Sequence, residues 1–471
     1  MLKFVLNDTD IETDLPAGTL VLDFVRYHRH LLGTKIGCRE GDCGACTVLV
    51  GEVKDDQLIY RSATSCLMSI GNASGKHIVT VEGVNMTTLN PVQQAMSDEG
   101  ATQCGFCTPG FVVSLAGFCL SDAEPSYERA IASIDGNICR CTGYKSIERA
   151  AMKLSSIMEQ RNGSDPITFL TENKFFPDYF NNIKQRLKKL TDQTNGVSSS
   201  AKVNAKFLGG GTDLYVQQHE TMVHADINFL FDKEEAKGIY KDGNKCFIGA
   251  SSTVTDLLQS DILKQHFPRL GDFVKLVSST PIRNMATIAG NFINASPIGD
   301  FTIFFLALNA QLVLSNGNTQ RELPLRQLYK GYKTLDKSPD EFVDRLWFEL
   351  PDANSFFNFE KVSKRTHLDI ASVNTALCIT MNGDVIRDAG LSAGGVAPVP
   401  SFLQKSSSFL KGKTISSEML DELIEIIQSE IAPISDARGT SEYKRLLLTQ
   451  LTRSHFHTLF PAIVDDTIFV R

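Results

Sequence analysis

The 471-residue sequence has no apolar run of about 18 residues, the length that a membrane-spanning helix needs. Its start turns polar after Leu6 and lacks a small-residue cleavage site, so we expect no signal peptide. Basic residues are not in excess, because the formal net charge is −7 and no basic stripe carries interleaved aromatics. These absences argue against a membrane span, a secreted protein and a nucleic-acid binder. We expect a cytoplasmic protein.

Histidine-based catalytic patterns and a disulfide framework are also missing. The nine histidines are scattered without a metal-ligand spacing, and no Ser/His/Asp set stands out. We therefore assign no catalytic residue in this chain. The eleven cysteines are not expected to form disulfides, because a reducing compartment fits the sequence better. In such a compartment, clustered thiols usually hold metal.

What the sequence does contain is a set of eight cysteines before residue 142, in two groups. The first group has the spacing C-x4-C-x2-C, with a fourth cysteine further on, and consists of Cys38, Cys43, Cys46 and Cys66. This is the spacing of plant-type [2Fe–2S] proteins. The nearby glycines would let the backbone curl around inorganic sulfide. Zinc is the alternative, but zinc sites prefer C-x2-C pairs.

The second group combines a C-x2-C pair with a C-x-C pair and consists of Cys104, Cys107, Cys139 and Cys141. Each pair precedes a segment with a helical pattern, whose N-terminal amides would favour anionic thiolates. Taken alone, this group fits zinc or iron equally. Beside the first group, a second cluster becomes the better prediction. Cys119, Cys246 and Cys378 lie in apolar surroundings and are expected to be small core residues.

Two loops further along the chain are candidates for binding a phosphate-bearing cofactor. The first is a strand that enters a glycine turn, Phe207-Leu208-Gly209-Gly210-Gly211-Thr212-Asp213-Leu214. Its backbone amides can form an anion nest, although a plain flexible turn fits as well, and it matches neither G-x-G-x-x-G nor a P-loop. The second loop, residues 286–300, is rich in small and hydrogen-bonding residues. It either wraps a polar cofactor or is an ordinary Asn/Ser/Pro loop.

The cysteine motifs resemble the xanthine dehydrogenase family of molybdenum hydroxylases. Residues 34–47 are similar to the ferredoxin-like domain of that family, and residues 103–110 and 137–144 are similar to its helical second-cluster domain. The resemblance implies that the first four cysteines bind one cluster and the second four bind another. In the family, the cluster of the helical domain lies nearer the molybdenum centre.

The two loops resemble the FAD-binding segments of the same family, in a fold shared with vanillyl-alcohol-oxidase-type flavoproteins. The resemblance implies that both loops cradle the diphosphate and ribityl chain, that Asp300 meets the isoalloxazine edge and that Lys361 lies near the flavin. Many relatives have an aromatic residue over the flavin where this chain has Val277. The implied FAD contacts are Phe207, Leu208, Gly209, Gly210, Gly211, Thr212, Asp213, Leu214, Thr287, Gly290, Asn291, Asn294, Asp300 and Lys361.

The predicted architecture is a multidomain α+β protein. Its parts are a β-grasp ferredoxin domain (1–82), a helical-bundle [2Fe–2S] domain (83–160), a linker (161–200), an α/β FAD domain of the vanillyl-alcohol-oxidase or PCMH type (201–352) and a C-terminal α+β flavoprotein domain (353–471). We expect strands at 2–6 and 47–50 and a helix at 20–32, from their apolar spacing. Residues 184–189 are expected to be the solvated face of a helix.

The function implied by the resemblance is electron transfer. A partner's molybdenum centre would oxidise xanthine or hypoxanthine to urate, and electrons would pass through both clusters to FAD and then to NAD+, or to O2. Because the sequence ends soon after the flavin segment, we expect molybdopterin on a separate large subunit, in a dimer of large–small pairs. The partner could instead act on an aldehyde, nicotinate, carbon monoxide or an aromatic thioester. The remaining alternatives are a stand-alone iron–sulfur flavoprotein carrier and a zinc-stabilised structural protein.

Overall fold

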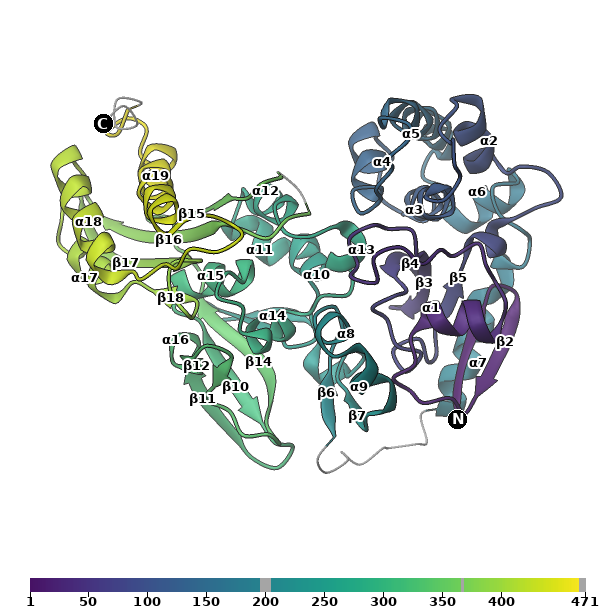
Figure 1. Cartoon of the computed structure of the whole chain (residues 1–471), viewed down its shortest axis with the longest axis horizontal. Coiled ribbons are helices and arrows are strands. Elements are labelled where there is room, and N and C mark those ends of the chain that lie inside the picture. Colours follow the sequence, from purple (N-terminus) through teal and green to yellow (C-terminus); the bar gives the residue numbers. More distant parts are fainter. Residues whose placement is uncertain (195–204, 366–367, 466–471) are drawn as a thin grey trace. The chain divides into compact units, whose positions relative to one another are not determined.

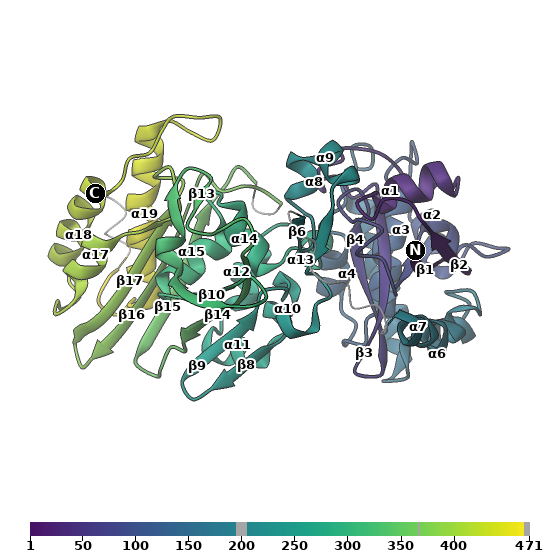
Figure 2. The same cartoon turned by 90° about the horizontal axis from the view of Figure 1, so that it is seen from below.

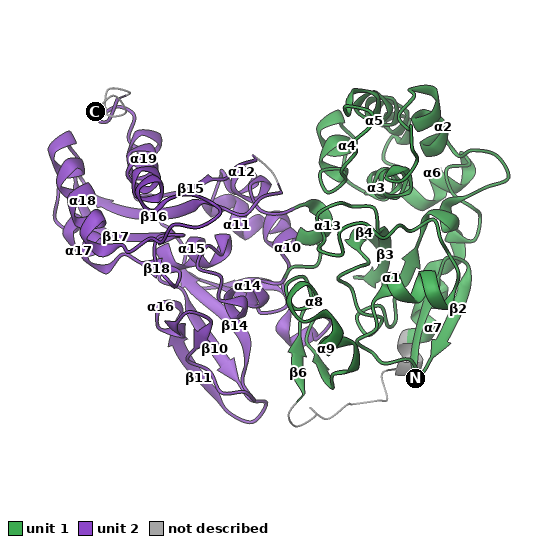
Figure 3. Ribbon diagram, viewed as in Figure 1, with its two compact units in different colours: residues 1–231, 279–286 green, residues 232–278, 287–471 purple. Residues whose placement is uncertain are grey.

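The computed structural model describes residues 1–194, 205–365 and 368–465, and it divides into two compact units. Unit 1 consists of Met1–Phe231 and Ser279–Ala286, and unit 2 of Asp232–Ser278 and Thr287–Arg471 (Figure 3). The chain therefore leaves unit 1, returns to it for eight residues and leaves it again. Within the described ranges, no helix is both long and apolar enough to cross a bilayer.

Unit 1 begins with a mixed five-stranded sheet in the order β2-β1-β5-β3-β4. Its strands are β1 (Leu2–Leu6), β2 (Thr9–Thr13), β3 (Thr47–Lys54), β4 (Gln57–Thr64) and β5 (His77–Val79). β1 runs parallel to β5 and the other pairings are antiparallel. The two-residue turn between β3 and β4 is made by Asp55 and Asp56, both with positive φ, as tight hairpins require. The strands expected at 2–6 and 47–50 are confirmed.

The helix expected over residues 20–32 is shorter than predicted. It consists of α1 (Val21–Asp23) and a π-helical turn over Phe24–His28. The Arg26 guanidinium donates hydrogen bonds to the carbonyls of Leu32 (3.2 Å) and Thr34 (2.6 Å). These bonds draw the following chain back across the turn, and His30 takes a positive φ there. The apolar spacing could not reveal this reversal.

Four helices follow the sheet and pack around a shared core. They are α2 (Pro91–Asp98), α3 (Thr108–Leu120), α4 (Tyr127–Ser133) and α5 (Lys145–Met158). Asn90 and Gln93 form a capping box at the start of α2, and Ser126 caps α4. Ten residues of α3 are buried, because this helix lies between the other helices and the sheet (Figure 1). The predicted helical bundle is confirmed.

The stretch expected as a linker contains two helices, α6 (Pro166–Glu172) and α7 (Phe180–Thr194). Their apolar side chains are buried in unit 1: Phe176 stacks on Phe180, and Ile183 and Leu187 pack against Val5. The predicted helix at 184–189 is part of α7, and Arg186 there pairs with two aspartates of the β1–β2 hairpin. Residues 195–200 of the expected linker lie outside the described ranges.

The rest of unit 1 is a short parallel strand pair with three small helices. The elements are β6 (Lys206–Leu208), β7 (Ile227–Phe229), α8 (Leu214–Gln217), α9 (His219–His224) and α13 (Thr280–Arg283). The last of these, α13, belongs to the eight-residue return segment. Thr280 and Arg283 both bind Asp135 of the helical bundle, and Asn284 donates to the Ser62 carbonyl of β4. The return segment is thereby tied to both parts of unit 1.

Unit 2 begins with an antiparallel five-stranded sheet in the order β11-β10-β14-β9-β8. Its strands are β8 (Ile239–Asp242), β9 (Lys245–Gly249), β10 (Gln311–Ser315), β11 (Gln320–Pro324) and β14 (Phe342–Glu349), with a small hairpin of β12 (Tyr329–Gly331) and β13 (Thr334–Leu335). Its helices are α10 (Val254–Gln259), α11 (Asp261–His266), α12 (Leu270–Lys275), α14 (Ile288–Asn294), α15 (Asp300–Ala307) and α16 (Leu325–Leu328).

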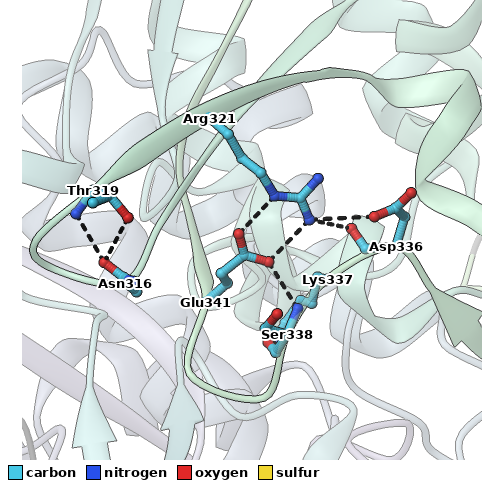
Figure 4. Close-up of polar contacts among 7 residues, drawn as sticks. All are labelled: Asn316, Thr319, Arg321, Asp336, Lys337, Ser338 and Glu341. Atoms are coloured by element: carbon cyan, nitrogen blue, oxygen red, sulfur yellow. Dashed lines mark hydrogen bonds and ion pairs between the residues drawn. The ribbon is translucent and has the colours of Figure 1, made fainter.

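One ionic cluster fastens the loop after β13 to the edge strand β11 (Figure 4). Arg321 donates to both carboxylate oxygens of Glu341, at 2.7 and 3.0 Å, and to the carbonyl of Asp336. The amide of Ser338 donates to the same Glu341 carboxylate. Arg321 thus lowers the pKa of Glu341 below its ordinary value, and the Ser338 amide adds to the effect.

The C-terminal part of unit 2 is an antiparallel sheet covered by helices (Figures 1 and 2). Its elements are β15 (Ser355–Val362), β16 (Val373–Asn382), β17 (Val385–Gly394), β18 (Ser401–Phe402), α17 (Gln404–Leu410), α18 (Ser417–Glu430) and α19 (Ser441–Leu459). The strands and helices expected beyond residue 351 are confirmed. Phe304 of α15 packs on Phe357 of β15, and Gly390 of β17 leaves room for the backbone of Ala307. Close packing of α15 on this sheet places the start of α15 beside β15 and β16.

Candidate iron–sulfur and flavin sites

The first four cysteines form two thiol pairs in unit 1, with Cys38, Cys43 and Cys46 on the loop before β3 and Cys66 just after β4. Cys38 and Cys43 form one pair: the Cys38 amide donates to the Cys43 sulfur at 3.4 Å, and the Cys43 thiol lowers the pKa of Cys38 to about 5. Cys46 and Cys66 form the other and are both buried; the Cys66 thiol lowers the pKa of Cys46. All eleven cysteines are free.

The glycines of this loop are required by its shape. Gly41 and Gly44 have positive φ, which strains any other residue. A Cβ at Gly37 would lie 2.6 Å from the Cys43 sulfur. The predicted role of small residues around the sulfurs therefore has a direct geometric reason.

The second four cysteines are also paired, near the surface of unit 1. The sulfurs of Cys104 and Cys141 lie 3.6 Å apart, and the thiols of Cys107 and Cys139 are in contact. Burial raises the pKa of Cys139, but hydrogen bonds from the hydroxyl and amide of Thr142 outweigh it and leave that pKa below the ordinary value. The thiolate form is thus favoured at one of the innermost sulfurs of this set.

The pairing of the thiols tests whether the residues fit a two-iron cluster. A [2Fe–2S] cluster takes four cysteine thiolates, two on each iron. Each set offers two pairs of thiols, with backbone amides directed at the sulfurs. Within residues 1–194, 205–365 and 368–465, no three Cys, His, Asp or Glu side chains are placed to hold one ion. The residues present fit a cluster of two irons in each set.

The chain segments that carry the two cysteine sets are in direct contact, which sequence reasoning missed. The amide of Ile138 donates to the carbonyl of Cys43 at 3.1 Å. The buried side chain of Asn137 donates to the Gly44 carbonyl at 3.1 Å and accepts from the Ser114 hydroxyl at 2.7 Å. A Cβ at Gly44 would lie 2.3 Å from the Gly136 carbonyl oxygen, so only glycine permits this approach. Asn137 and Ile138 stood beside a predicted ligand, but nothing in their spacing indicated the partner loop.

The glycine turn predicted to bind FAD lies in unit 1 and is packed against its ferredoxin part. A Cβ at Gly210 would lie 1.7 Å from the Met285 carbonyl oxygen, and one at Gly211 would lie 2.8 Å from that of Leu67. Asn72 donates to the Gly209 carbonyl at 2.9 Å. Packing within unit 1 therefore accounts for Gly210 and Gly211 without a ligand. The contact of residues 207–214 with FAD stays a prediction.

The second loop lies in unit 2 and presents polar groups at an accessible surface. Thr287 caps α14 by accepting from the Gly290 amide at 3.1 Å, and Asn291 accepts from the amide and hydroxyl of Thr302. Gly290 is exposed, whereas Asn291, Asn294 and Asp300 are half-buried. Reachable amide and carboxylate groups on a capped helix are the kind of surface that a polar cofactor needs.

Asp300 and Lys361, two residues predicted to lie near FAD, are brought together in unit 2. The Lys361 ammonium donates to the Asp300 carboxylate at 2.8 Å and to the carbonyl of Leu276 at 2.6 Å. Asn374 donates to the other oxygen of Asp300 at 2.6 Å. Sequence reasoning missed Asn374, which lies 74 residues from Asp300.

Known protein families match four successive parts of the chain. Their descriptions are "2Fe-2S iron-sulfur cluster binding domain" (residues 4–70), "[2Fe-2S] binding domain" (80–152), "FAD binding domain in molybdopterin dehydrogenase" (183–351) and "CO dehydrogenase flavoprotein C-terminal domain" (359–459). All eight paired cysteines lie within the first two. The predicted fold, with ferredoxin, helical cluster, flavin and C-terminal flavoprotein parts, is confirmed.

Characterised proteins give the same result. The chain is 30% identical over 482 residues to a xanthine dehydrogenase of Emericella nidulans, covering 88% of this chain and 35% of that protein. It is 28% identical over 547 residues to one of Oryza sativa, covering 96% and 39%. A CO dehydrogenase chain from Oligotropha carboxidovorans matches with a TM-score of 0.52 and 25% identity, over 55% of this chain and 90% of that one. The chain thus spans well under half of the curated relatives it matches.

Proposed function

This chain belongs to the molybdenum hydroxylase family that includes the xanthine dehydrogenases, and on that basis we propose that it carries electrons away from a molybdenum centre. The order is a cluster held by Cys104, Cys107, Cys139 and Cys141, a cluster held by Cys38, Cys43, Cys46 and Cys66, then FAD and NAD+. When bound, the clusters exchange single electrons and FAD exchanges one or two, which suits it to a hydride acceptor. The protein's own groups hold these cofactors, set their distances and exclude water.

The observation that carries the proposal is the hydrogen bond between Ile138 and Cys43. Ile138 is bonded directly to Cys139, so one backbone hydrogen bond connects a ligand-bearing segment of each set. Asn137 fastens the same two loops and keeps the contact dry, because its side chain is buried. Electrons passing between the sets have a short route through bonded atoms and one hydrogen bond.

We propose that the FAD lies against the second loop, with Asp300 at the ring edge and Thr287, Gly290, Asn291 and Asn294 along the chain of the cofactor. The polarity of these groups, and the accessibility of Gly290, Asn291, Asn294 and Asp300, support this placement. The contact of the glycine turn at 209–211 with the diphosphate stays a prediction from the resemblance. NAD+ is the proposed acceptor, with O2 as the alternative.

A partner that bears molybdopterin is proposed to cover the second cysteine set. Cys104 and Cys141 are exposed, and the side chains of Phe106 and Ile138 beside them are 48% and 40% exposed. Exposed apolar side chains around reactive thiols are the composition expected of an interface core. We propose a dimer of such pairs, in the cytoplasm, where thiols stay reduced.

The proposed substrate of the partner is xanthine or hypoxanthine, oxidised to urate in purine catabolism, as the names of the relatives suggest. The alternative substrates are an aldehyde, nicotinate and carbon monoxide. The likeness to CO dehydrogenase is the reason to test them. Co-expression with a molybdopterin-binding gene neighbour, and an anaerobic assay of each substrate with NAD+, discriminates them. A stable protein that purifies with no partner and transfers electrons to several acceptors would instead favour a stand-alone carrier.

The proposal is tested by anaerobic titration of the purified chain with NADH, followed by visible absorbance, with dithionite as the endpoint. Bleaching by NADH close to the dithionite endpoint supports FAD and both clusters connected to nicotinamide. Bleaching by dithionite alone favours another acceptor. A colourless protein that contains zinc, after cofactor loss has been excluded, would overturn the proposal.

A further inference from the structure

Three polar side chains meet in the interior of unit 2 where β15 and β16 face the start of α15. Lys361 comes from β15, Asn374 from β16 and Asp300 from the first turn of α15. The Lys361 side chain is 1% exposed, and the Asn374 residue is fully buried. Asp300 is 13% exposed and is the member of the group that reaches the surface.

Both oxygens of Asp300 are occupied by these neighbours. Oδ2 accepts from the Lys361 ammonium at 2.8 Å, and Oδ1 accepts from the Asn374 amide at 2.6 Å. The ion pair supplies most of the attraction, but an ammonium on a flexible stem does not fix the plane of a carboxylate. The second, uncharged donor fixes that plane.

The orientation of the Asn374 amide is determined by its surroundings. Its nitrogen donates to the Ile298 carbonyl at 3.1 Å as well as to Asp300, so a flipped amide would place oxygen against two acceptors. Its own oxygen is buried and has no hydrogen-bond partner among the described residues. Leaving such an atom buried and unpaired is unfavourable. The protein has asparagine at this position, although an apolar side chain of similar size would avoid the cost of the unpaired oxygen.

Glycine at position 394 keeps Asn374 in place. A Cβ on Gly394 would lie 2.2 Å from the Asn374 amide oxygen and 3.0 Å from the Pro297 carbonyl oxygen. The amide of the next residue, Gly395, donates to the same Pro297 carbonyl at 3.0 Å. The end of β17 therefore lies directly against both the Asn374 amide and the loop that precedes Asp300, and only glycine leaves room for this approach.

We infer that Asn374 is a positioning residue that fixes the Asp300 carboxylate toward the bound flavin. The inference rests on the proposed function, because it takes the FAD to lie beside Asp300. Reduction adds negative charge to a flavin, and a carboxylate at its edge opposes that charge. The Asn374 amide dipole partly neutralises the carboxylate and prevents it from rotating. Asn374 therefore makes the flavin easier to reduce than the Asp300 charge alone would allow.

The test uses the full chain with its cofactors and measures the NADH-to-NAD+ ratio that half-reduces the flavin. Asn374→Leu, which is close in size and lacks the donor, is expected to raise this ratio at least threefold in the flavin that the protein retains. Asn374→Asp, which sets a second carboxylate against the first, is expected to raise it further. Asp300→Asn is expected to lower the ratio.

The double variant separates positioning from a merely structural role. If Asn374 acts through Asp300, then Asn374→Leu has no further effect in the Asp300→Asn background. An unchanged ratio in Asn374→Leu, with FAD retained, would overturn the inference, as would an equal shift in both backgrounds. Loss of FAD is read separately by visible circular dichroism and FAD content, and Asn374→Ser, which restores one donor, is then expected to recover FAD with an intermediate ratio. A wild-type chain that binds no FAD contradicts the proposed function instead.

Discussion

The amide nitrogen of Ile138 donates a hydrogen bond of 3.1 Å to the carbonyl oxygen of Cys43. This bond joins the backbone segments that carry the two cysteine sets. Neither residue contributes its side chain to this bond, so the contact depends on the path of two loops. Asn137 is the side chain that holds those loops together, and it offers the clearest way to perturb them.

Replacing Asn137 by Ala is expected to destabilise unit 1. The Ser114 hydroxyl and the Gly44 carbonyl would each lose a buried partner, at about 1–3 kcal/mol in total. A unit of this size should then melt about 2–12 °C lower, as measured by circular dichroism. The matched control is Asn182→Ala, an exposed amide on α7 of the same unit, which should stay near the wild-type melting temperature. Equal decreases in melting temperature in the two variants would mean that Asn137 does not hold the two loops together.

Replacing a predicted ligand should remove one cluster and leave the other. Cys104→Ser is expected to lower the iron content of the purified chain to about half, because only one of the two sets loses a thiolate. Iron and acid-labile sulfide analysis measures this. Cys378→Ala serves as the control, since that cysteine lies outside both sets and should keep the full iron content. Wild-type iron in Cys104→Ser would contradict the assignment of the second set.

The apolar surface around the second set should govern binding of the molybdopterin-bearing partner. Phe106→Ser is expected to weaken that binding about tenfold or more, because a large exposed aromatic side chain is a typical interface anchor. Titration calorimetry with the separately purified partner measures the change. Ile434→Ser removes a 71% exposed side chain in unit 2 and should leave the affinity unchanged. If both variants bind as wild type does, the partner docks elsewhere.

The ion pair of Arg321 and Glu341 should contribute stability that depends on pH. The native pKa of Glu341 is depressed by Arg321, so the folded state binds fewer protons than the unfolded state as the pH falls. The contribution is complete above the ordinary value of 4.5 and is lost as the pH drops through the lower, native pKa.

Glu341→Gln should therefore melt about 1–3 °C below wild type at about pH 6, since Arg321 is partly exposed and such pairs are worth about 1 kcal/mol or less. The gap should shrink below about pH 4.5. Differential scanning fluorimetry across this range measures it, with the exposed Glu349→Gln as a matched charge control. A gap that does not change with pH would show that packing, rather than charge, is responsible.

Much of the fold could be predicted from local patterns. The strand at 2–6 and the capped helix after Asn90 depend on alternation and capping, which neighbouring residues determine. The cysteine sets were found because cluster ligands recur at short spacings. In contrast, residues 161–200 are predicted as a linker with a helix face only at 184–189, because apolar side chains such as Phe176 and Ile183 are buried by partners elsewhere in unit 1 that local patterns do not reveal.

The residues that sequence reasoning missed act over long distances. Asn374 meets Asp300 across 74 positions, and Asn137 meets Gly44 across 93. Neither residue belongs to a motif from which its contact partner can be predicted. The pairing of the thiols could not be predicted either. Spacing indicates which cysteines converge, but not which two sulfurs are in contact.

The return of residues 279–286 to unit 1 limits how this chain can be divided. Ile282 lies against Gly41 and Leu67, and Met285 is almost fully buried there, although both belong in sequence to the flavin part. A fragment that begins at Asp232 would expose these apolar side chains to water. The other fragment would have cavities where the same side chains pack. Fusion, fission or exchange of genes between the iron–sulfur and flavin parts of this chain must therefore supply new apolar cover for Ile282 and Met285.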